Sequence, residues 1–202
     1  MPVTRPMLIS LGLACCGLAS ASEPMVPSLH LGIADAQGDF RNEMGTKHAS
    51  QGALSLTIPL TGTLAIRPRV AFQAFTTIDN QYAYKSTRYN DLGAEDSRWS
   101  AWSLGGDVLY RPSGPRGRLY FLAGAYLKVW REHSFGTYTT SDRVNPTRTY
   151  IVNDTSTKDE PAVALGLGYT LHRRVSLESR YVFCIYRGLS YNTLEAAIVL
   201  SY

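Results

Sequence analysis

Apolar side chains alternate with small or polar ones over most of the chain beyond residue 28. In the last segment the apolar row is Leu194, Ala196, Ile198, Leu200 and Tyr202. A spacing of two residues places such a row on one face of a β-strand. The same pattern recurs and predicts eight strands, at residues 29–37, 49–60, 64–76, 99–111, 118–131, 161–171, 175–186 and 194–202.

The links between these strands alternate between short turns and other, mostly longer, connections. Strands of roughly 9–11 residues can cross a bilayer when tilted, and an even number of strands brings both chain ends to one side. The pattern therefore predicts an all-β fold, an eight-stranded antiparallel up-and-down transmembrane β-barrel. Periplasmic turns are expected at residues 61–63, 112–117 and 172–174, and outward connections at residues 38–48, 77–98, 132–160 and 187–192.

A soluble β-sandwich also has alternating strands, and the residues opposite the apolar rows distinguish the two folds. A sandwich would leave the charges on that face in solvent, whereas a barrel would enclose them in its lumen. The apolar rows and the other features below favour the barrel. The charges expected in its lumen are Arg67, Arg69, Asp107, Arg111, Lys128, Glu178, Arg180 and Glu195.

Charges in such a lumen must be paired, because an eight-stranded barrel is just wide enough for side chains to fill it. We expect Asp107 to lie within reach of Arg67 or Arg69 on the neighbouring strand, and Glu178 shares a face with Arg180. A structural salt-bridge network is the favoured interpretation. A proton- or ion-conducting path through these groups is the alternative.

Two of the predicted strands carry irregular features. Pro68 lacks the N–H that a closed sheet needs, so we expect a bulge there. Residues 118–131 have large apolar side chains on both faces. Because Lys128 is charged, the face that carries it is expected to point into the lumen. The residues then expected to face outward are Leu119, Phe121, Ala123, Ala125, Leu127 and Val129.

The N-terminal residues 1–21 are predicted to be a secretory signal peptide. Residues 7–19 form an apolar run, and residues 19–21 supply small side chains at the cleavage spacing. The alternatives are a membrane-spanning helix, for which the run is short, and a lipoprotein signal at Cys15, which the preceding residues fit poorly. Residues 22–202 would then form one barrel domain, exported to the bacterial outer membrane.

Cysteine content and charge exclude some classes of protein. Cys15 and Cys16 would leave with the signal peptide, so Cys184 would remain alone without an internal disulfide. The net charge of +4 at pH 7 is too mild to favour nucleic-acid binding. The histidines are scattered, without the close spacing of metal ligands, and no cofactor is expected.

Lipid-modifying enzymes can also be barrels of this size, so a catalytic constellation has to be considered. Glu132, His133 and Ser134 are the only Ser-His-acid neighbourhood. Neighbouring residues on an extended segment point in different directions, so they do not form a triad by themselves. The chain is therefore not predicted to be an enzyme.

One hairpin carries a family resemblance. The run Leu165-Gly166-Leu167-Gly168-Tyr169-Thr170-Leu171, followed by Val175-Ser176-Leu177-Glu178-Ser179-Arg180-Tyr181, resembles the penultimate hairpin of the OmpA-like, opacity-type eight-stranded outer-membrane β-barrel family. The resemblance is most specific over residues 161–202 and is generic over residues 28–131. It implies no shared catalytic chemistry, since members are structural barrels, adhesins, serum-resistance proteins or very narrow channels.

The end of the chain both follows and departs from this family. By resemblance to the family's terminal aromatic, Leu200 and Tyr202 are expected to be a signal for barrel assembly, although the family usually has Phe where Tyr202 stands. No periplasmic peptidoglycan-binding domain follows in this sequence. We therefore expect no anchoring role through the cell wall.

The long outer connections contain many aromatic and hydroxyl residues. Tyr82 and Tyr84 lie in the first, and Phe135, Tyr138 and Tyr150 lie among Thr, Ser and Asn in the second. This is the composition of adaptable binding surfaces. In the alternative interpretation, the aromatics extend the barrel wall above the membrane or lie at the lipid headgroups. Residues 147–152 are also expected to pair across residues 143–146 as a protruding hairpin.

These observations predict an integral outer-membrane protein with a structural or adhesin-like surface-interaction role. A small narrow channel is the main alternative, and a lipid-modifying enzyme is a weaker one. The expected partners are outer-membrane lipid and lipopolysaccharide, the barrel-assembly machinery and an extracellular ligand bound by the outer loops. No nucleic-acid partner is expected.

Overall fold

The computed structural model describes residues 24–39, 48–75, 78–85, 89–114, 117–142, 148–186 and 189–202. The predicted signal peptide, residues 1–21, lies outside these ranges. The strands are β1 (Val26–Gln37), β2 (His48–Pro59), β3 (Leu64–Phe75), β4 (Ile78–Lys85), β5 (Tyr89–Tyr110), β6 (Leu119–Asp142), β7 (Arg148–His172), β8 (Val175–Tyr186), β9 (Leu189–Ser190) and β10 (Asn192–Ser201).

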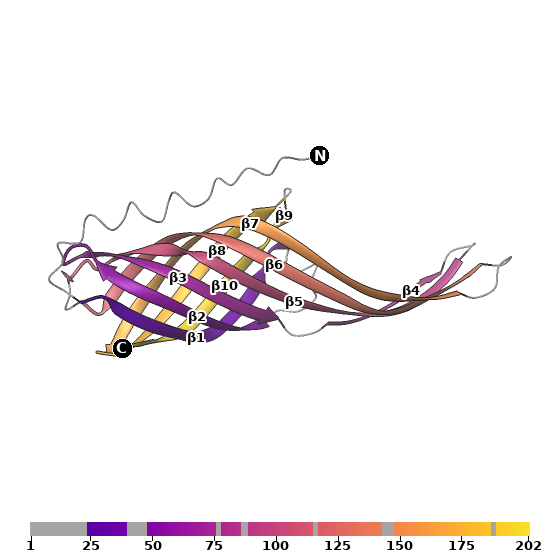
Figure 1. The fold of residues 1–202 in the computed structure, drawn as a ribbon, viewed down its shortest axis with the longest axis horizontal. Coiled ribbons are helices and arrows are strands. Elements are labelled where there is room, and N and C mark those ends of the chain that lie inside the picture. The colour runs from indigo at the N-terminus through magenta and orange to yellow at the C-terminus, as the bar shows by residue number, and fades with distance from the viewer. Residues whose placement is uncertain are drawn as a thin grey trace.

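Eight of these strands form a closed antiparallel barrel with up-and-down topology, as predicted (Figure 1). Each barrel strand pairs with the next in the order β1, β2, β3, β5, β6, β7, β8 and β10, while β4 and β9 are additions to β5 and β8. The barrel closes where β1 pairs with β10, as at Leu29 and Leu200. Closure leaves no free edge around the barrel wall, which satisfies the backbone hydrogen bonds without solvent.

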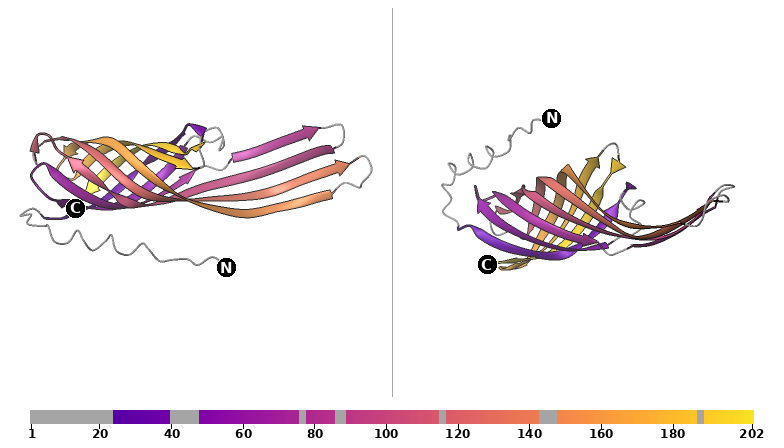
Figure 2. Two further views of the ribbon diagram at one scale, coloured as in Figure 1. Left: turned by 90° about the horizontal axis from the view of Figure 1, so that it is seen from above. Right: turned by 45° about the vertical axis from the view of Figure 1, so that its right-hand side comes forward.

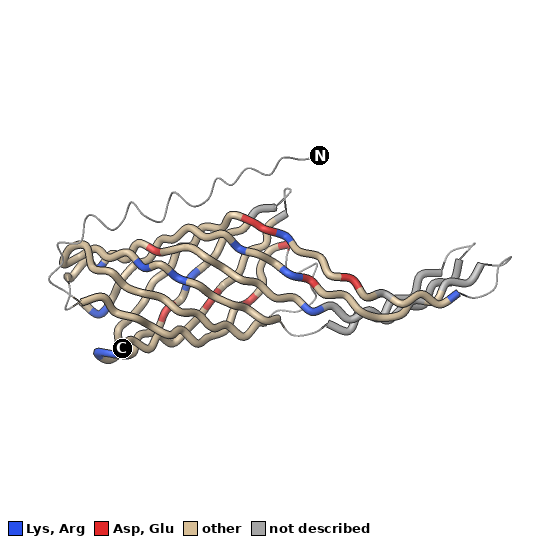
Figure 3. Tube along the Cα trace, in the orientation of Figure 1, with Lys and Arg blue, Asp and Glu red and all other residues tan. Residues whose placement is uncertain are grey.

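The two faces of the wall have opposite chemistry. Apolar side chains point outward, including Leu54 and Leu104, which are 66% and 63% exposed. Polar and charged side chains point inward, and the described parts of the strands carry both signs of charge along their length (Figure 3). The predicted facing of β6 is confirmed, because Lys128 is buried while Phe121 is exposed. An apolar exterior over a polar interior is the pattern of a transmembrane barrel.

Four strands continue far past one rim of the barrel. β4 and the outer parts of β5, β6 and β7 lie side by side as a projecting sheet (Figures 1 and 2). The prediction that residues 77–98 and 132–160 are loops was therefore wrong over most of their length. The hairpin expected near residues 143–146 falls partly on residues 143–147, outside the described ranges; the residues after them pair with β6 as part of this larger sheet, with Tyr150 opposite Tyr138.

The bulge predicted at Pro68 is absent. β2 and β3 keep one register on both sides of it, with Ser55 opposite Arg69 and Ile58 opposite Ile66. Pro68 interrupts the ladder between them, while on its other side it lies opposite Gly106 without a shift. The missing N–H is thus accommodated as a gap in the β2–β3 pairing. Among the described residues, no helix is long and apolar enough to cross a membrane.

Candidate functional site

A network of buried ion pairs lies at the centre of the barrel. Arg67 on β3 donates to Asp107 on β5, 2.8 Å from Nη2 to Oδ2, and also to Glu178 on β8. Arg180, also on β8, reaches Asp107 at 3.1 Å and Glu178 at 3.2 Å. Asp107 lies directly opposite Arg67 in the β3–β5 ladder, so strand register alone brings the first pair together. The result is a four-residue ionic cluster that links three strands across the lumen.

A second set of polar groups surrounds Glu195 on β10. Gln51 and Gln73 donate amide hydrogen bonds to its carboxylate at 3.0 Å and 2.7 Å. Arg69 approaches the same carboxylate at 3.6 Å. His30 lies between the two sets, with Nε2 2.7 Å from the Ser55 hydroxyl. Together the two sets form what we call the lumen network.

Two tyrosines connect the lumen network to the wall, and glycines provide the space they occupy. Tyr120 donates to Glu178 at 2.7 Å, and Tyr126 donates to Asp107. A Cβ at Gly168 would overlap the Tyr120 ring, and one at Gly124 would overlap Tyr126 and Asp107. Gly124 and Gly168 are therefore needed for packing, because without a Cβ they leave space for large polar side chains to lie flat across the lumen.

Around Arg180 and Glu195 the lumen network leaves no room for water between its members. The space bounded by His30, Gln51, Arg69, Glu178, Arg180 and Glu195 has essentially no volume for a water molecule. The buried charges also balance, with four cations and four anions among the described residues, namely Arg67, Arg69, Lys128, Arg180, Asp107, Glu160, Glu178 and Glu195. A packed and charge-balanced interior acts as a scaffold.

Aromatic side chains cap this interior toward the projecting sheet. Trp130 is 1% exposed, and its ring lies 5.8 Å from Phe75 and 6.2 Å from Tyr191. Its indole N–H donates to Glu160 at 3.1 Å. The Lys128 ammonium lies 4.3 Å from the Trp130 ring centre. Phe75, Trp130 and Tyr191 form what we call the aromatic cap, which closes the lumen at this end.

A basic hollow lies at the base of the projecting sheet, between outward-facing arginines and the buried rings of Phe75 and Trp99. Arg98 pairs across strands with His133, and its guanidinium lies 5.0 Å from the Phe135 ring centre. His133 stacks on the same ring and lies 3.1 Å from the Thr155 hydroxyl. Arg98, Arg131, His133 and Thr155 border a cavity of about 420 Å³. Two arginines and a histidine around one hollow make it suited to anionic groups.

The possible catalytic neighbourhood is not assembled as a triad. His133 belongs to the outer face of β6, whereas Glu132 and Ser134 alternate to its inner face. The hydroxyl that approaches His133 comes from Thr155 on β7. Among the described residues, no cluster of His, Cys, Asp and Glu could hold a metal ion. Cys184 is fully buried with a free thiol and packs within the interior.

The structure places seven of the eight predicted lumen charges in the interior. Arg111 is the exception, because it lies half-buried at the mouth beside the short turns. At the chain end, Leu200 pairs with Leu29 and Val175, and Tyr202 is 73% exposed.

Several members of the interior were not singled out from the sequence. His30, Gln51 and Gln73 alternate with outward apolar residues, so the same two-residue spacing that located the charges could have located them. Glu160 and Lys158 precede the strand that was predicted at residues 161–171. No apolar alternation marks that stretch, and it therefore carried no signal.

Comparison with known proteins shows the fold. No family model matches the sequence, and no curated protein matches it either. Among solved structures, the attachment invasion locus protein Ail of Yersinia pestis, in complex with the heparin analogue sucrose octasulfate, has 11% sequence identity and a TM-score of 0.55, covering 89% of this chain and 100% of that chain. Ail without that ligand gives a TM-score of 0.50 at the same identity and coverage. Neisserial surface protein A has 14% identity and a TM-score of 0.46, covering 88% and 97%. At these identities the likeness to Ail shows a shared β-barrel fold.

Proposed function

We propose that this chain is an integral outer-membrane β-barrel protein with a surface-interaction role, performed by the projecting sheet. The observation that carries the proposal is the combination of a filled lumen with a sheet that continues the barrel wall outward (Figure 2). A filled lumen offers no transport path. The sequence of the projecting sheet is rich in Tyr, Ser, Thr and Asn, a composition suited to adaptable binding.

The membrane location is supported by the outer wall. Large apolar side chains such as Trp102, Leu165 and Val163 are more than half exposed around the barrel. Apolar area of this extent is costly in water and is stabilised by lipid. In this proposal Leu200 and Tyr202 serve as the recognition signal for the barrel-assembly machinery, and the exported domain begins after the signal peptide. The short turns then face the periplasm, and the projecting sheet faces the exterior.

Lipopolysaccharide is the proposed lipid partner of the basic hollow. The hollow lies next to the apolar belt, because Arg98 and Arg131 are close in the strands to the outward-facing Trp102 and Val129. A phosphorylated lipid whose chains cover the belt would bring its anionic groups to this level. Bidentate arginine contacts suit phosphate. Charge and position along the wall support this proposed partner.

The rival function, a narrow channel, makes a different prediction in planar bilayers. The filled lumen predicts no steady conductance from the full-length protein above the bilayer background. Reproducible single-channel openings would overturn the surface-interaction proposal in favour of transport. The proposal assigns no catalytic role, since His133 faces away from Glu132 and Ser134.

Binding by the projecting sheet is tested with cells that display the protein. The probe is immobilised heparin, chosen because the solved Ail complex contains a heparin analogue. A trimmed variant replaces residues 77–97 and residues 135–153 with Asn-Gly turns. We expect cells with the full chain to adhere and cells with the trimmed chain to lose adhesion at equal surface abundance. Equal adhesion by both, or none by the full chain, contradicts a heparin-binding role of the sheet.

A further inference from the structure

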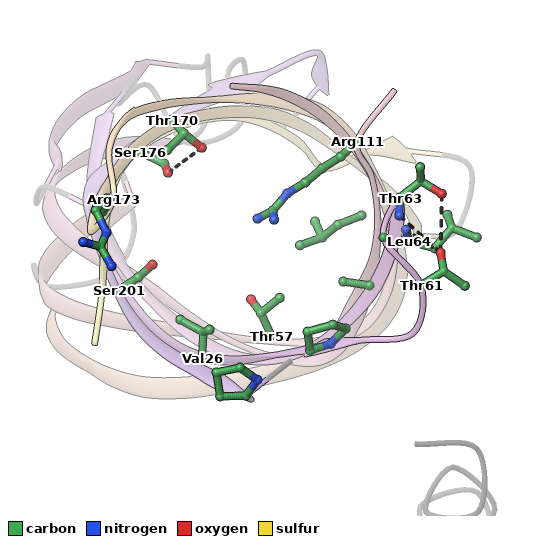
Figure 4. A pocket seen from close by; sticks show the side chains of 15 residues that line it. Val26, Thr57, Thr61, Thr63, Leu64, Arg111, Thr170, Arg173, Ser176 and Ser201 are labelled. Atoms are coloured by element: carbon green, nitrogen blue, oxygen red, sulfur yellow. Dashed lines mark hydrogen bonds between the residues drawn. The ribbon is translucent and has the colours of Figure 1, made fainter. Parts of the chain in front are cut away.

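A hollow of about 280 Å³ opens at the mouth of the barrel beside the short turns (Figure 4). It lies inside the ring of strands, at the end opposite the projecting sheet. Its wall includes hydroxyl side chains from four strands: Thr57, Thr170, Ser176 and Ser201. Because liquid water occupies about 30 Å³ per molecule, the hollow has the volume of roughly nine waters.

Arg111 points into the middle of this hollow (Figure 4). Its backbone N–H donates to the Thr63 carbonyl at 2.8 Å, which fixes its position at the end of β5. Its guanidinium lies 5.8 Å from the Tyr120 ring centre, and the ring supports it from the lumen side. Both the backbone and the side chain of Arg111 are therefore held in place.

Arg111 differs from the buried arginines in its partners. Arg67, Arg69 and Arg180 each have a carboxylate within 4 Å. Among the described residues, no carboxylate forms an ion pair with Arg111 and none lines the hollow, while Arg173 adds a second cation to the rim. The lumen network behind it is balanced in charge and does not cancel this positive potential. An arginine fork without a resident anion is thus presented to solvent.

The inner end of the hollow is apolar. Leu109, Tyr120 and Leu122 form a buried cluster there, with Ala65 packed against it. Leu109 and Ala65 also line the hollow. The site therefore combines a cationic fork, hydroxyl donors and an apolar floor in one enclosed space, which is the composition of a small-molecule pocket.

We propose that this mouth is a binding site for a soluble small organic anion, a carboxylate or phosphate with a compact apolar part. Arg111 holds the anionic group through its paired N–H donors, and the hydroxyls complete its hydrogen bonds. The apolar part of the ligand lies on the Leu109 floor. The site requires only the barrel and is independent of what the projecting sheet binds.

The test is a titration of the refolded full chain in nanodiscs of neutral lipid, with benzoate and phenyl phosphate as probes. We expect saturable binding of at least one probe. Benzyl alcohol, which matches benzoate in shape without its charge, should bind at least about tenfold more weakly, because hydrogen bonds to charged groups contribute on the order of 1.5–3 kcal/mol. The absence of saturable binding of both anions overturns the proposal.

Variants assign the binding to the hollow. Arg111→Gln should weaken binding by about tenfold or more, whereas Arg118→Gln, a change in a neighbouring turn residue outside the hollow, should leave it unchanged. If Arg111→Gln fails to fold, Arg111→Lys serves instead, since lysine keeps the charge but lacks the planar fork. Affinity unchanged by the Arg111 variant that folds overturns the proposal.

A final arm distinguishes a soluble ligand from a lipid headgroup. The same titration is repeated in nanodiscs that contain phosphatidylglycerol. Unchanged benzoate affinity supports a soluble anion, because the hollow lies within the wall and away from the lipid. Displacement of benzoate by phosphatidylglycerol overturns the soluble-anion assignment and identifies a lipid phosphate as the occupant.

Discussion

Arg67 connects three strands of the barrel interior. It extends from β3 and donates to carboxylates on β5 and β8, so one guanidinium crosslinks strands on different sides of the lumen. Removing it leaves Asp107 and Glu178 buried, with Arg180 as their remaining close cation. Removing Arg67 would therefore destabilise the fold mainly because it leaves buried negative charge uncompensated.

The substitution Arg67→Met is expected to lower the free energy of unfolding by about 3–5 kcal/mol, the cost of breaking a buried ion pair. Urea unfolding in lipid vesicles measures it. Arg148→Met, in an exposed position on the projecting sheet, is the control and should change stability by less than about 0.5 kcal/mol. Equal stability of the two variants would show that the lumen network contributes nothing to folding.

Gly168 gives a second prediction at the residue scale. A Cβ there would overlap the buried Tyr120 ring, which is held by its hydrogen bond to Glu178. Gly168→Ala is expected to destabilise the barrel by about 1–3 kcal/mol through overpacking. Gly52→Ala is the matched control, because nothing lies near a Cβ at Gly52. Equal unfolding midpoints would mean that Tyr120 moves aside without cost.

The contact between Asp39 and Ser190 at the outer rim is expected to depend on pH. Ser190 donates its backbone N–H at 2.9 Å and its hydroxyl at 3.0 Å to the Asp39 carboxylate. These hydrogen bonds hold the pKa of Asp39 below its usual range. The contact stabilises the fold above the ordinary carboxyl pKa of about 4 and is lost as the pH falls through the lowered value. The amide resonance of Ser190 should report this change at acid pH, and Asp39→Asn should abolish it. A resonance that titrates equally in both proteins contradicts the assignment.

At the scale of elements, sequence alternation located the barrel strands but not the projecting sheet. Alternation is strong where one face meets lipid and the other meets a packed lumen, as along β10. Residues 148–151 and 153–157 of β7 are exposed or partly exposed, so this stretch gives no two-residue signal although its backbone pairs with β6. The sequence therefore underestimates strands that lie beyond the membrane.

The candidate site was also only partly predictable from the sequence. Inward position follows from spacing, which is why Asp107 could be assigned in advance to Arg67 or Arg69, and the register selects Arg67. Which distant strands meet across the lumen depends on barrel closure and side-chain length. The contacts of Arg67 with Glu178 and of Gln73 with Glu195 therefore had no local signal.

The projecting sheet should be dispensable for folding of the barrel. Ser134 lies opposite Asp154, so an Asn-Gly turn can replace residues 135–153 without changing the register of β6 and β7. The trimmed variant defined above is expected to keep heat-modifiable migration on a detergent gel, because the lumen network and the aromatic cap lie below the cut. The full chain, boiled and unboiled, is the control. Loss of the heat shift only in the trimmed protein would make the sheet part of the folding unit.

At the scale of the whole molecule, three obstructions lie in series along the barrel axis. From the mouth outward, these are the apolar cluster of Leu109, Tyr120 and Leu122, then the lumen network, and then the aromatic cap. Resistances in series are governed by the least permeable layer. Thinning one layer should therefore leave the barrel closed to ions.

This arrangement predicts how conductance depends on combined substitutions. Trp130→Ala alone should give no steady openings in planar bilayers, because the lumen network around Arg180 and Glu195 still leaves no room for water. Trp130→Ala combined with Arg180→Ala and Tyr120→Ala thins all three layers and should produce measurable openings. Heat-modifiable migration of each variant establishes that the barrel has folded. Openings with Trp130→Ala alone would show that the aromatic cap is the sole barrier, and the packed network would then be a water-filled path that one tryptophan closes.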